Sequence, residues 1–270
     1  MRKSIRRLSV LVFVGILFLS GCSQKNDDVF KVGLEAGYAP FNWTQLDDSN
    51  GGVAIEDSKE FAGGYDVEIA KRIAKSLNKE LVIVKIGWEG LVPAVDSGVV
   101  DAIIAGMSPT EKRKESIDFS ANYYKSDLVL VVKKGGDYAD ASRLRDFENA
   151  TVTAQQNTFH YSVIDQIEGV NKDTAMSNFP AMRVALESGI IDAYVSERPE
   201  GVSASAANDN FLMIELEDGF QTSDDDTAIA VGLKKGNSQI EEINKAIDEI
   251  TEEERQSIMD EAIKNQPAAQ

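Results

Sequence analysis

One segment of eleven residues occurs twice in this chain, and the two copies limit its fold more than any other feature. Residues 94–104 read AVDSGVVDAII, and residues 185–195, which lie 91 positions later, read ALESGIIDAYV. Each copy predicts the end of a helix at Ser-Gly, a tight turn, and the start of a strand at Asp-Ala. A period of this length is too long for a solenoid. The repeat therefore predicts two lobes of similar construction, each with its own sheet. The alternative is reuse of common turn chemistry within one α/β domain.

Strand-like and helix-like segments alternate in the first half of the chain. Periodic apolar residues predict strands at 29–34, 81–86 and 101–105 and helices at 67–78 and 91–95. This βαβαβ order is typical of a parallel sheet covered by helices on both faces. Such sheets bind ligands at the carboxyl ends of their strands, so the repeat points to residues 105–108 and 196–197.

A strong helix start follows the first of these segments. Ser108 fits the N-cap position, Pro109 fits the first helical position, and Glu111 completes a capping box. The next three residues are all cationic, and cations in a first turn oppose the helix dipole unless an anion binds there. We therefore interpret the free backbone N–H groups and the guanidinium of Arg113 as a carboxylate-binding site. A solvated basic helix face is the alternative.

Thr158 occupies a comparable place in the second half of the chain. Residues 151–155 predict a strand, and the helical spacing of Tyr161, Ile164 and Ile167 predicts a helix after Thr158. Thr158 can cap this helix and leave its first amides free for a ligand. A cap with no further role is the alternative.

Charge and composition exclude several classes of function. Four of the 28 basic residues lie in residues 1–22, so the remainder has 24 basic and 45 acidic residues and a net charge of −21. This balance argues against nucleic acid as a partner. Cys22 and His160 are the only residues of their types, so we expect no zinc site, and we interpret His160 as structural. The acidic run 224–226 lacks the glycine and spacing of a calcium loop, which predicts a solvated loop and no metal or cofactor.

The first 22 residues predict export and membrane anchoring. A basic start and an apolar stretch at 8–19 precede the sequence Leu-Ser-Gly-Cys that ends at Cys22. This layout is typical of a secretory signal rather than a membrane span, and it resembles the lipobox of bacterial lipoproteins. We expect removal of residues 1–21, lipidation of Cys22, a tether at 22–28, and a location on the outer face of the cell membrane. A chance cysteine after an ordinary signal is the alternative.

Five segments carry a resemblance to a protein family. They read YAPF at 38–41, GYDVEIAKRIAKSL at 64–77, SPTEKR at 108–113, DA at 192–193 with an acid at 197, and AVGLKKG at 230–236. In this order they resemble the amino-acid-binding proteins of ABC importers, the bacterial family 3 solute-binding proteins. The resemblance covers nearly the whole chain after the tether.

The resemblance implies an α/β clamshell of the type II periplasmic-binding-protein class. Each lobe is expected to be a mostly parallel sheet flanked by helices, and two hinge strands are expected to join the lobes. Lobe one is predicted at 29–125 plus 225–270, and lobe two at 126–224. The expected protein is a monomer that closes on one free L-amino acid and delivers it to an ABC permease.

The resemblance also implies roles for individual residues. Arg113 holds the α-carboxylate of the ligand, Ser108 adds its hydroxyl or amide, and Thr158 reaches the carboxylate from the other lobe. Glu197 takes the α-ammonium, at a position where the family most often has aspartate. The chain has Asn157 where the family commonly has glycine.

Four further positions complete the predicted site: Gly106 beside Ser108, and Glu35, Tyr38 and Trp88 around the ligand's side chain. The resemblance places an acid at position 35 in members that bind lysine, arginine or histidine. A guanidinium stacks well between aromatic rings, so we expect Tyr38 and Trp88 to sandwich it. Arginine ahead of lysine is the predicted ligand. A neutral polar amino acid or cystine comes next, with glutamine and histidine as further alternatives.

Two other classes of function compete with transport. The clamshell fold also occurs in enzymes such as dehydratases, but the sequence offers no nucleophile paired with a base, so we expect no enzyme. A surface interaction protein would share the lipid anchor and would not need a closing cleft.

Overall fold

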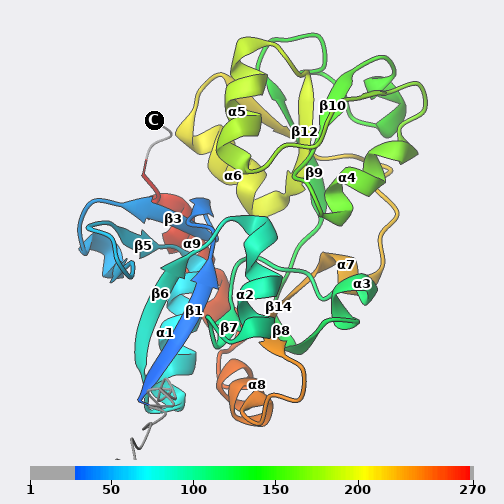
Figure 1. Ribbon diagram of the computed structural model, residues 1–270. Helices are drawn as coiled ribbons and strands as arrows, with labels where there is room; N and C mark the ends of the chain where they lie inside the picture. Colours follow the sequence, from blue (N-terminus) through cyan, green and yellow to red (C-terminus); the bar gives the residue numbers. More distant parts are fainter. Residues whose placement is uncertain (1–27, 268–270) are drawn as a thin grey trace, which may run out of the picture.

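A computed structural model describes residues 28–267 as two lobes, each built on its own five-stranded sheet (Figure 1). The blue-to-green first part of the chain and its orange-to-red last part form lobe one, and the green-to-yellow middle forms lobe two. The two-lobed α/β architecture predicted from the repeat is confirmed. The predicted signal segment and the lipidated Cys22 lie outside the described residues, and their roles stay predictions.

The sheet of lobe one has the order β6-β1-β7-β14-β8, and that of lobe two has the order β11-β10-β12-β9-β13. The strands of lobe one are β1 (Val29–Leu34), β6 (Glu80–Lys85), β7 (Ala102–Ile103), β8 (Ile117–Lys125) and β14 (Ala228–Lys234). Those of lobe two are β9 (Leu128–Lys133), β10 (Thr151–Thr153), β11 (Asn171–Lys172), β12 (Ala193–Glu197) and β13 (Phe211–Ile214). A smaller sheet of lobe one contains β2 (Gly37–Tyr38), β3 (Asn42–Gln45), β4 (Val53–Ala54) and β5 (Phe61–Gly63).

Helices cover both sheets. The helices of lobe one are α1 (Tyr65–Ser76), α2 (Leu91–Ser97), α3 (Glu111–Lys114), α7 (Asp224–Thr227), α8 (Ile240–Asp248) and α9 (Glu252–Asn265). Those of lobe two are α4 (Phe159–Val163), α5 (Phe179–Ser188) and α6 (Arg198–Ala207). Within residues 28–267, no helix combines the length and the apolar character needed to cross a membrane.

Each sheet is mixed rather than mostly parallel, which corrects the prediction. The pairs β6–β1 and β1–β7 are parallel, whereas β14 runs antiparallel to both β7 and β8. Lobe two repeats this pattern, with β9 antiparallel to β12 and β13. The antiparallel strands follow the two crossings between the lobes: β9 begins just after β8 ends, and β14 follows the return segment 215–227. The predicted boundaries of the lobes stay a prediction.

The repeat encodes the same junction in both lobes. Gly98 and Gly189 end α2 and α5 with left-handed φ angles of 79° and 74°. The carboxylates of Asp101 and Asp192 then accept backbone N–H groups of β1 and β10, at 2.9 and 2.7 Å. Each aspartate therefore joins the incoming strand to its parallel neighbour, which explains why Ser-Gly and Asp-Ala recur at this spacing.

Gly64, the first residue of the segment 64–77, occupies a position that no other residue fits. Its φ is 120°, and a Cβ there would lie 2.4 Å from the main-chain oxygen of Phe41. We predict that Gly64→Ala lowers the free energy of unfolding by at least about 3 kcal/mol. Gly98→Ala is the matched control, because its φ is also positive but nothing lies within 4 Å of its Cβ position. We expect the control to lose about 1 kcal/mol in urea denaturation, and equal losses would contradict the steric argument.

Candidate functional site

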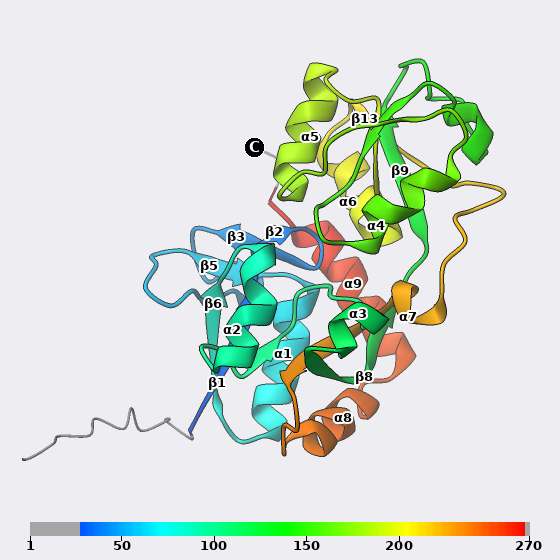
Figure 2. The ribbon, with the colours of Figure 1, turned by 45° about the vertical axis from the view of Figure 1, so that its right-hand side comes forward.

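A small cavity lies where the two lobes meet. Its lining residues are Tyr38, Trp88, Gly106, Ser108, Arg113, Gln155, Thr158, Phe159, His160 and Glu197. The structure thus brings together seven of the eight residues predicted to bind ligand, and only Glu35 lies behind the lining. Figure 2 shows α4 on the face of lobe two that is turned toward lobe one. A larger groove along α9 is lined by polar and charged residues of that helix alone.

The carboxyl ends of the strands supply most of this lining. Ser108 follows β7, Gln155 follows β10, and Glu197 is the last residue of β12. The parallel strands of each sheet end at the same edge, so these side chains converge from two lobes on one cavity. Both segments that the repeat singled out, 105–108 and 196–197, contribute to it.

The guanidinium of Arg113 lines the cavity, and the nearby Asp226 carboxylate acts on its charge. Nη1 donates to the main-chain oxygen of Ser108 at 2.8 Å, and Nη2 donates to that of Asn157 at 3.1 Å, across the two lobes. The guanidinium carbon lies 5.0 Å from the ring centroid of Trp88. Among residues 28–267, no ion pair within 4 Å includes Arg113. Burial lowers the pKa of this side chain to about 10, although the residue as a whole is half-buried.

The helix that contains Arg113 begins later than predicted. Its N-cap is Thr110, and α3 is a single turn with its basic residues at the C-terminal end, where the helix dipole favours cations. Ser108 is not the cap, because its hydroxyl donates to the main-chain oxygen of Asp226 at 2.8 Å. The predicted conflict between cations and dipole is therefore wrong, and the case for an anion rests instead on the unpaired guanidinium of Arg113.

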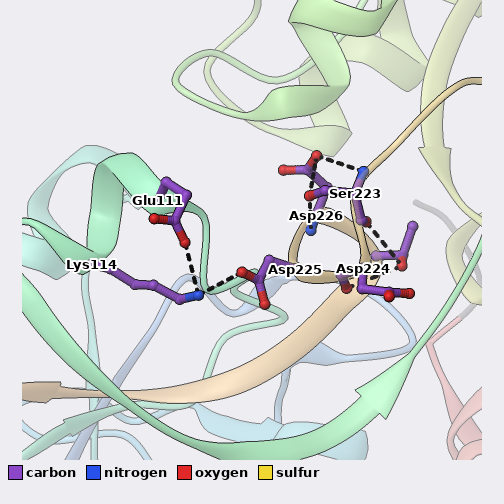
Figure 3. Close-up of polar contacts among 7 residues, drawn as sticks. Glu111, Lys114, Ser223, Asp224, Asp225 and Asp226 are labelled. Carbon is purple, nitrogen blue, oxygen red and sulfur yellow. Dashed lines mark hydrogen bonds and ion pairs between the residues drawn. The ribbon is translucent and has the colours of Figure 1, made fainter.

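The acidic run 224–226 is a helical turn, not the predicted solvated loop. Ser223 caps α7 reciprocally with Asp226, whose amide nitrogen lies 3.1 Å from the Ser223 hydroxyl. Lys114, the last residue of α3, has its ammonium nitrogen 3.0 Å from Glu111 of the same helix and 2.5 Å from Asp225 of α7 (Figure 3). The return crossing between the lobes is thereby tied to the turn that carries Arg113.

Glu197 and His160 are buried beside each other on the lobe-two side. Glu197 is 3 % exposed, and burial raises its pKa to about 8. His160 Nε2 lies 3.1 Å from Glu197 Oε1 but is not aligned as a hydrogen bond, and Oε2 has no partner among the described residues. Burial, together with the nearby Arg113, lowers the pKa of His160 to about 3, so this imidazole is neutral.

Thr158 is the N-cap residue of α4 as predicted, but its hydroxyl does not cap the helix. The hydroxyl donates to the main-chain oxygen of Gln155 at 2.7 Å. The Gln155 amide in turn donates to Glu35 Oε2 at 3.0 Å and to the main-chain oxygen of Ser177 at 3.1 Å. With both amide hydrogens used, the oxygen of Gln155 is the group left to face the cavity. Burial raises the pKa of Glu35 to about 6.

Tyr38 offers its hydroxyl rather than a ring face. Phe41 and Phe179 stack on its ring at centroid distances of 4.9 and 4.3 Å, and they make no ring contact with each other. They therefore cover opposite faces, so the predicted sandwich of a ligand between Tyr38 and Trp88 is wrong for Tyr38. Its hydroxyl is buried and has no partner among the described residues. Phe179 belongs to lobe two, so this stack also joins the lobes.

A buried polar network holds the loop that contains Gly106. The Tyr123 hydroxyl accepts the Gly106 N–H at 3.2 Å and donates to Asp66 at 2.7 Å. Asn42 donates to the other oxygen of Asp66 at 2.8 Å. Gly106 itself has a φ of 61°, and a Cβ there would lie 2.7 Å from the Tyr38 ring. Asp66 thus helps to hold the loop of Gly106 in the cavity wall.

Sequence reasoning missed three lining residues, Gln155, Phe159 and His160. His160 was interpreted as structural because it is the only histidine. The predicted helix start at Thr158 was the one available signal, since it places neighbouring residues at the same strand end. Nothing local in the sequence indicates that Gln155 meets Glu35 from the other lobe.

Comparison with known proteins supports the resemblance. The model for bacterial extracellular solute-binding proteins, family 3, matches residues 30–264. A probable histidine-binding protein of Campylobacter jejuni is 28 % identical over 89 % of this chain and 90 % of its own length. The arginine-binding extracellular protein ArtP of Bacillus subtilis is 25 % identical over 90 % and 91 %. The crystal structure of the substrate-binding protein AbpA of Streptococcus pneumoniae bound to L-arginine is 26 % identical, with a TM-score of 0.76, covering 90 % of this chain and 97 % of that one.

We predict that Tyr123→Phe lowers the free energy of unfolding by about 1–3 kcal/mol, because it removes a hydrogen bond from the buried Asp66 carboxyl group. Tyr124→Phe is the control, since its hydroxyl makes no hydrogen bond within residues 28–267. We expect the control to change stability by less than about 0.5 kcal/mol in urea denaturation. Similar losses in both variants would argue against the network.

Proposed function

Because the chain belongs to the bacterial extracellular solute-binding proteins of family 3, we propose that it binds one free amino acid between its lobes for an ABC importer. One observation carries this proposal: the desolvated guanidinium of Arg113 and the buried carboxyl group of Glu197, whose Oε2 has no partner among the described residues, line the same small cavity from opposite lobes. An α-amino acid brings a carboxylate and an ammonium group on one carbon, so it matches both at once.

The carboxylate of the ligand binds on the Arg113 side. Two of the five guanidinium N–H groups donate to protein oxygens, which leaves three for a bidentate pair. The hydroxyl hydrogens of Ser108 and Thr158 are used within the protein, so these residues contribute their backbone N–H groups. The anion is thus contacted from both lobes.

The ammonium group of the ligand binds to Glu197. Its unpartnered Oε2 is an acceptor, and a cation beside it lowers the raised pKa of this carboxyl group. Neutral His160, whose ring nitrogens have no hydrogen bond within the described residues, supplies a second acceptor. This end of the cavity favours a primary ammonium over a neutral group.

The side chain of the ligand is cationic, and arginine ranks ahead of lysine. Three acceptors lie on that side: the hydroxyl oxygen of Tyr38, the amide oxygen of Gln155, and Glu35 behind it. Relatives named for arginine, histidine or lysine support a cation. Cystine and glutamine, which other relatives are named for, are the neutral alternatives.

The transport role needs a membrane partner. The lipidated Cys22 would hold the protein, as a monomer, at the outer face of the cell membrane, where an ABC permease receives the amino acid. The family consists of extracellular solute-binding proteins, in keeping with a binding function rather than catalysis.

We predict that Arg113→Ala weakens binding of every amino acid by at least about 100-fold, because it strands the ligand carboxylate. Lys112→Ala is the control: Lys112 is an exposed cation on the same helical turn and does not line the cavity. We expect it to change affinity less than about twofold. Calorimetry of the ligand-stripped proteins measures both, and an unchanged affinity of Arg113→Ala would refute the proposed site.

We predict that Glu35→Gln weakens L-arginine about tenfold, as expected for the loss of a charge interaction of about 1.4 kcal/mol. The amide oxygen of the new side chain can still accept the hydrogen bond from Gln155, so the contact between the lobes is kept. Binding of a neutral amino acid such as L-glutamine serves as the control and should change little. Equal losses for both ligands would show that Glu35 does not act through its charge.

A further inference from the structure

Asn157 of lobe two makes two contacts with lobe one at the rim of the cavity. Its side-chain amide donates to Glu89 Oε1, and its main-chain oxygen accepts a hydrogen bond from Arg113 at 3.1 Å. Glu89 belongs to the short helix Trp88–Gly90, directly after the lining residue Trp88. Asn157 of lobe two therefore contacts two residues of lobe one, Glu89 and Arg113, at the rim of the cavity.

The backbone conformation of Asn157 would also suit glycine, so this conformation does not by itself require the Asn157 side chain. Its φ is 55°, a left-handed conformation that glycine adopts without cost and that asparagine adopts more readily than most other residues. Asn157 is exposed, so its side chain adds nothing to the core. The bond to Glu89 is the one side-chain contact it makes within the described residues.

The Asn157–Glu89 bond requires the two lobes to lie close together, because each lobe contributes one of its residues. Residues 155–157 carry three polar contacts between the lobes: Gln155 to Glu35, and Asn157 to Glu89 and Arg113. Gln155 is buried, whereas Asn157 and Glu89 are both exposed at the outer end. Separation of the lobes must break the outer bond before a ligand can leave past it.

We propose that the Asn157–Glu89 bond is a latch that positions Arg113 and slows release of the bound amino acid. The latch rests on the proposed function for its ligand, but its contacts do not depend on which amino acid binds. A single hydrogen bond to a charged group at an exposed site sets the expected size of the effect at about three- to tenfold in the dissociation rate.

Asn157→Gly tests the latch without backbone strain, because glycine tolerates the same φ. We expect L-arginine to dissociate about three- to tenfold faster, with little change in the association rate, in stopped-flow tryptophan fluorescence. Glu89→Ala should give the same increase, and the double variant Asn157→Gly with Glu89→Ala should release no faster than either single one. Glu89→Gln, which keeps an acceptor oxygen but loses the charge, should release the ligand more slowly than Glu89→Ala.

Other outcomes separate the latch from the proposed function. Parental release rates in Asn157→Gly, or release from Glu89→Gln as fast as from Glu89→Ala, would overturn the latch while leaving amino-acid binding intact. If the parental protein binds no amino acid, the proposed function fails, and small-angle scattering of the ligand-free proteins then decides about the latch. A larger radius of gyration in Asn157→Gly than in the parent supports it, and equal radii overturn it.

Discussion

The guanidinium of Arg113 is desolvated and forms no ion pair within 4 Å among residues 28–267, and the rest of the site follows from that constraint. A buried cation is costly unless charged or polar groups compensate for the lost water. Carbonyl oxygens of Ser108 and Asn157 and the ring of Trp88 do so only in part, because they are neutral. They orient the guanidinium, and the Asp226 carboxylate offsets its charge only from beyond ion-pair distance. A small anion that reaches the cavity therefore gains a strong, directional partner that is already in position.

Such an arrangement requires a rigid wall, and remote parts of the sequence supply it. Lys114 ties the turn of Arg113 to Asp225 on the return crossing, and the hydroxyl of Ser108 binds the next residue of that crossing. On the other side, Tyr123 and Asp66 hold the loop of Gly106 from below. The loop between β7 and α3 is thus held by partners outside the cavity lining: Asp225, the main-chain oxygen of Asp226, and Tyr123 with Asp66.

Structural features that depend on nearby residues could be predicted from the sequence. The Ser-Gly and Asp-Ala junctions of the repeat form the same turn in both lobes because glycine and aspartate act within a few residues or on the adjacent strand. The helix start at Ser108 was misplaced because its hydroxyl bonds to a carbonyl 118 residues away. Gln155 was missed for a similar reason, since its partner Glu35 lies in the other lobe. The order of the motifs predicted most residues of the cavity lining. Hydrogen bonds between residues distant in the sequence determine which polar atoms of that lining remain available to a ligand.

The two lobes contribute opposite electrostatic problems, and one ligand solves both. Burial raises the pKa of Glu197 to about 8, so closed lobes without a cation favour the neutral acid near pH 7. Closure around an unpaired carboxylate becomes less favourable as pH rises from the ordinary carboxyl range toward 8, because the open form releases its proton first. An ammonium group in the cavity removes that penalty, as a carboxylate does for Arg113. Under the proposed function, ligand binding and lobe closure are therefore coupled through the buried charges of Arg113 and Glu197.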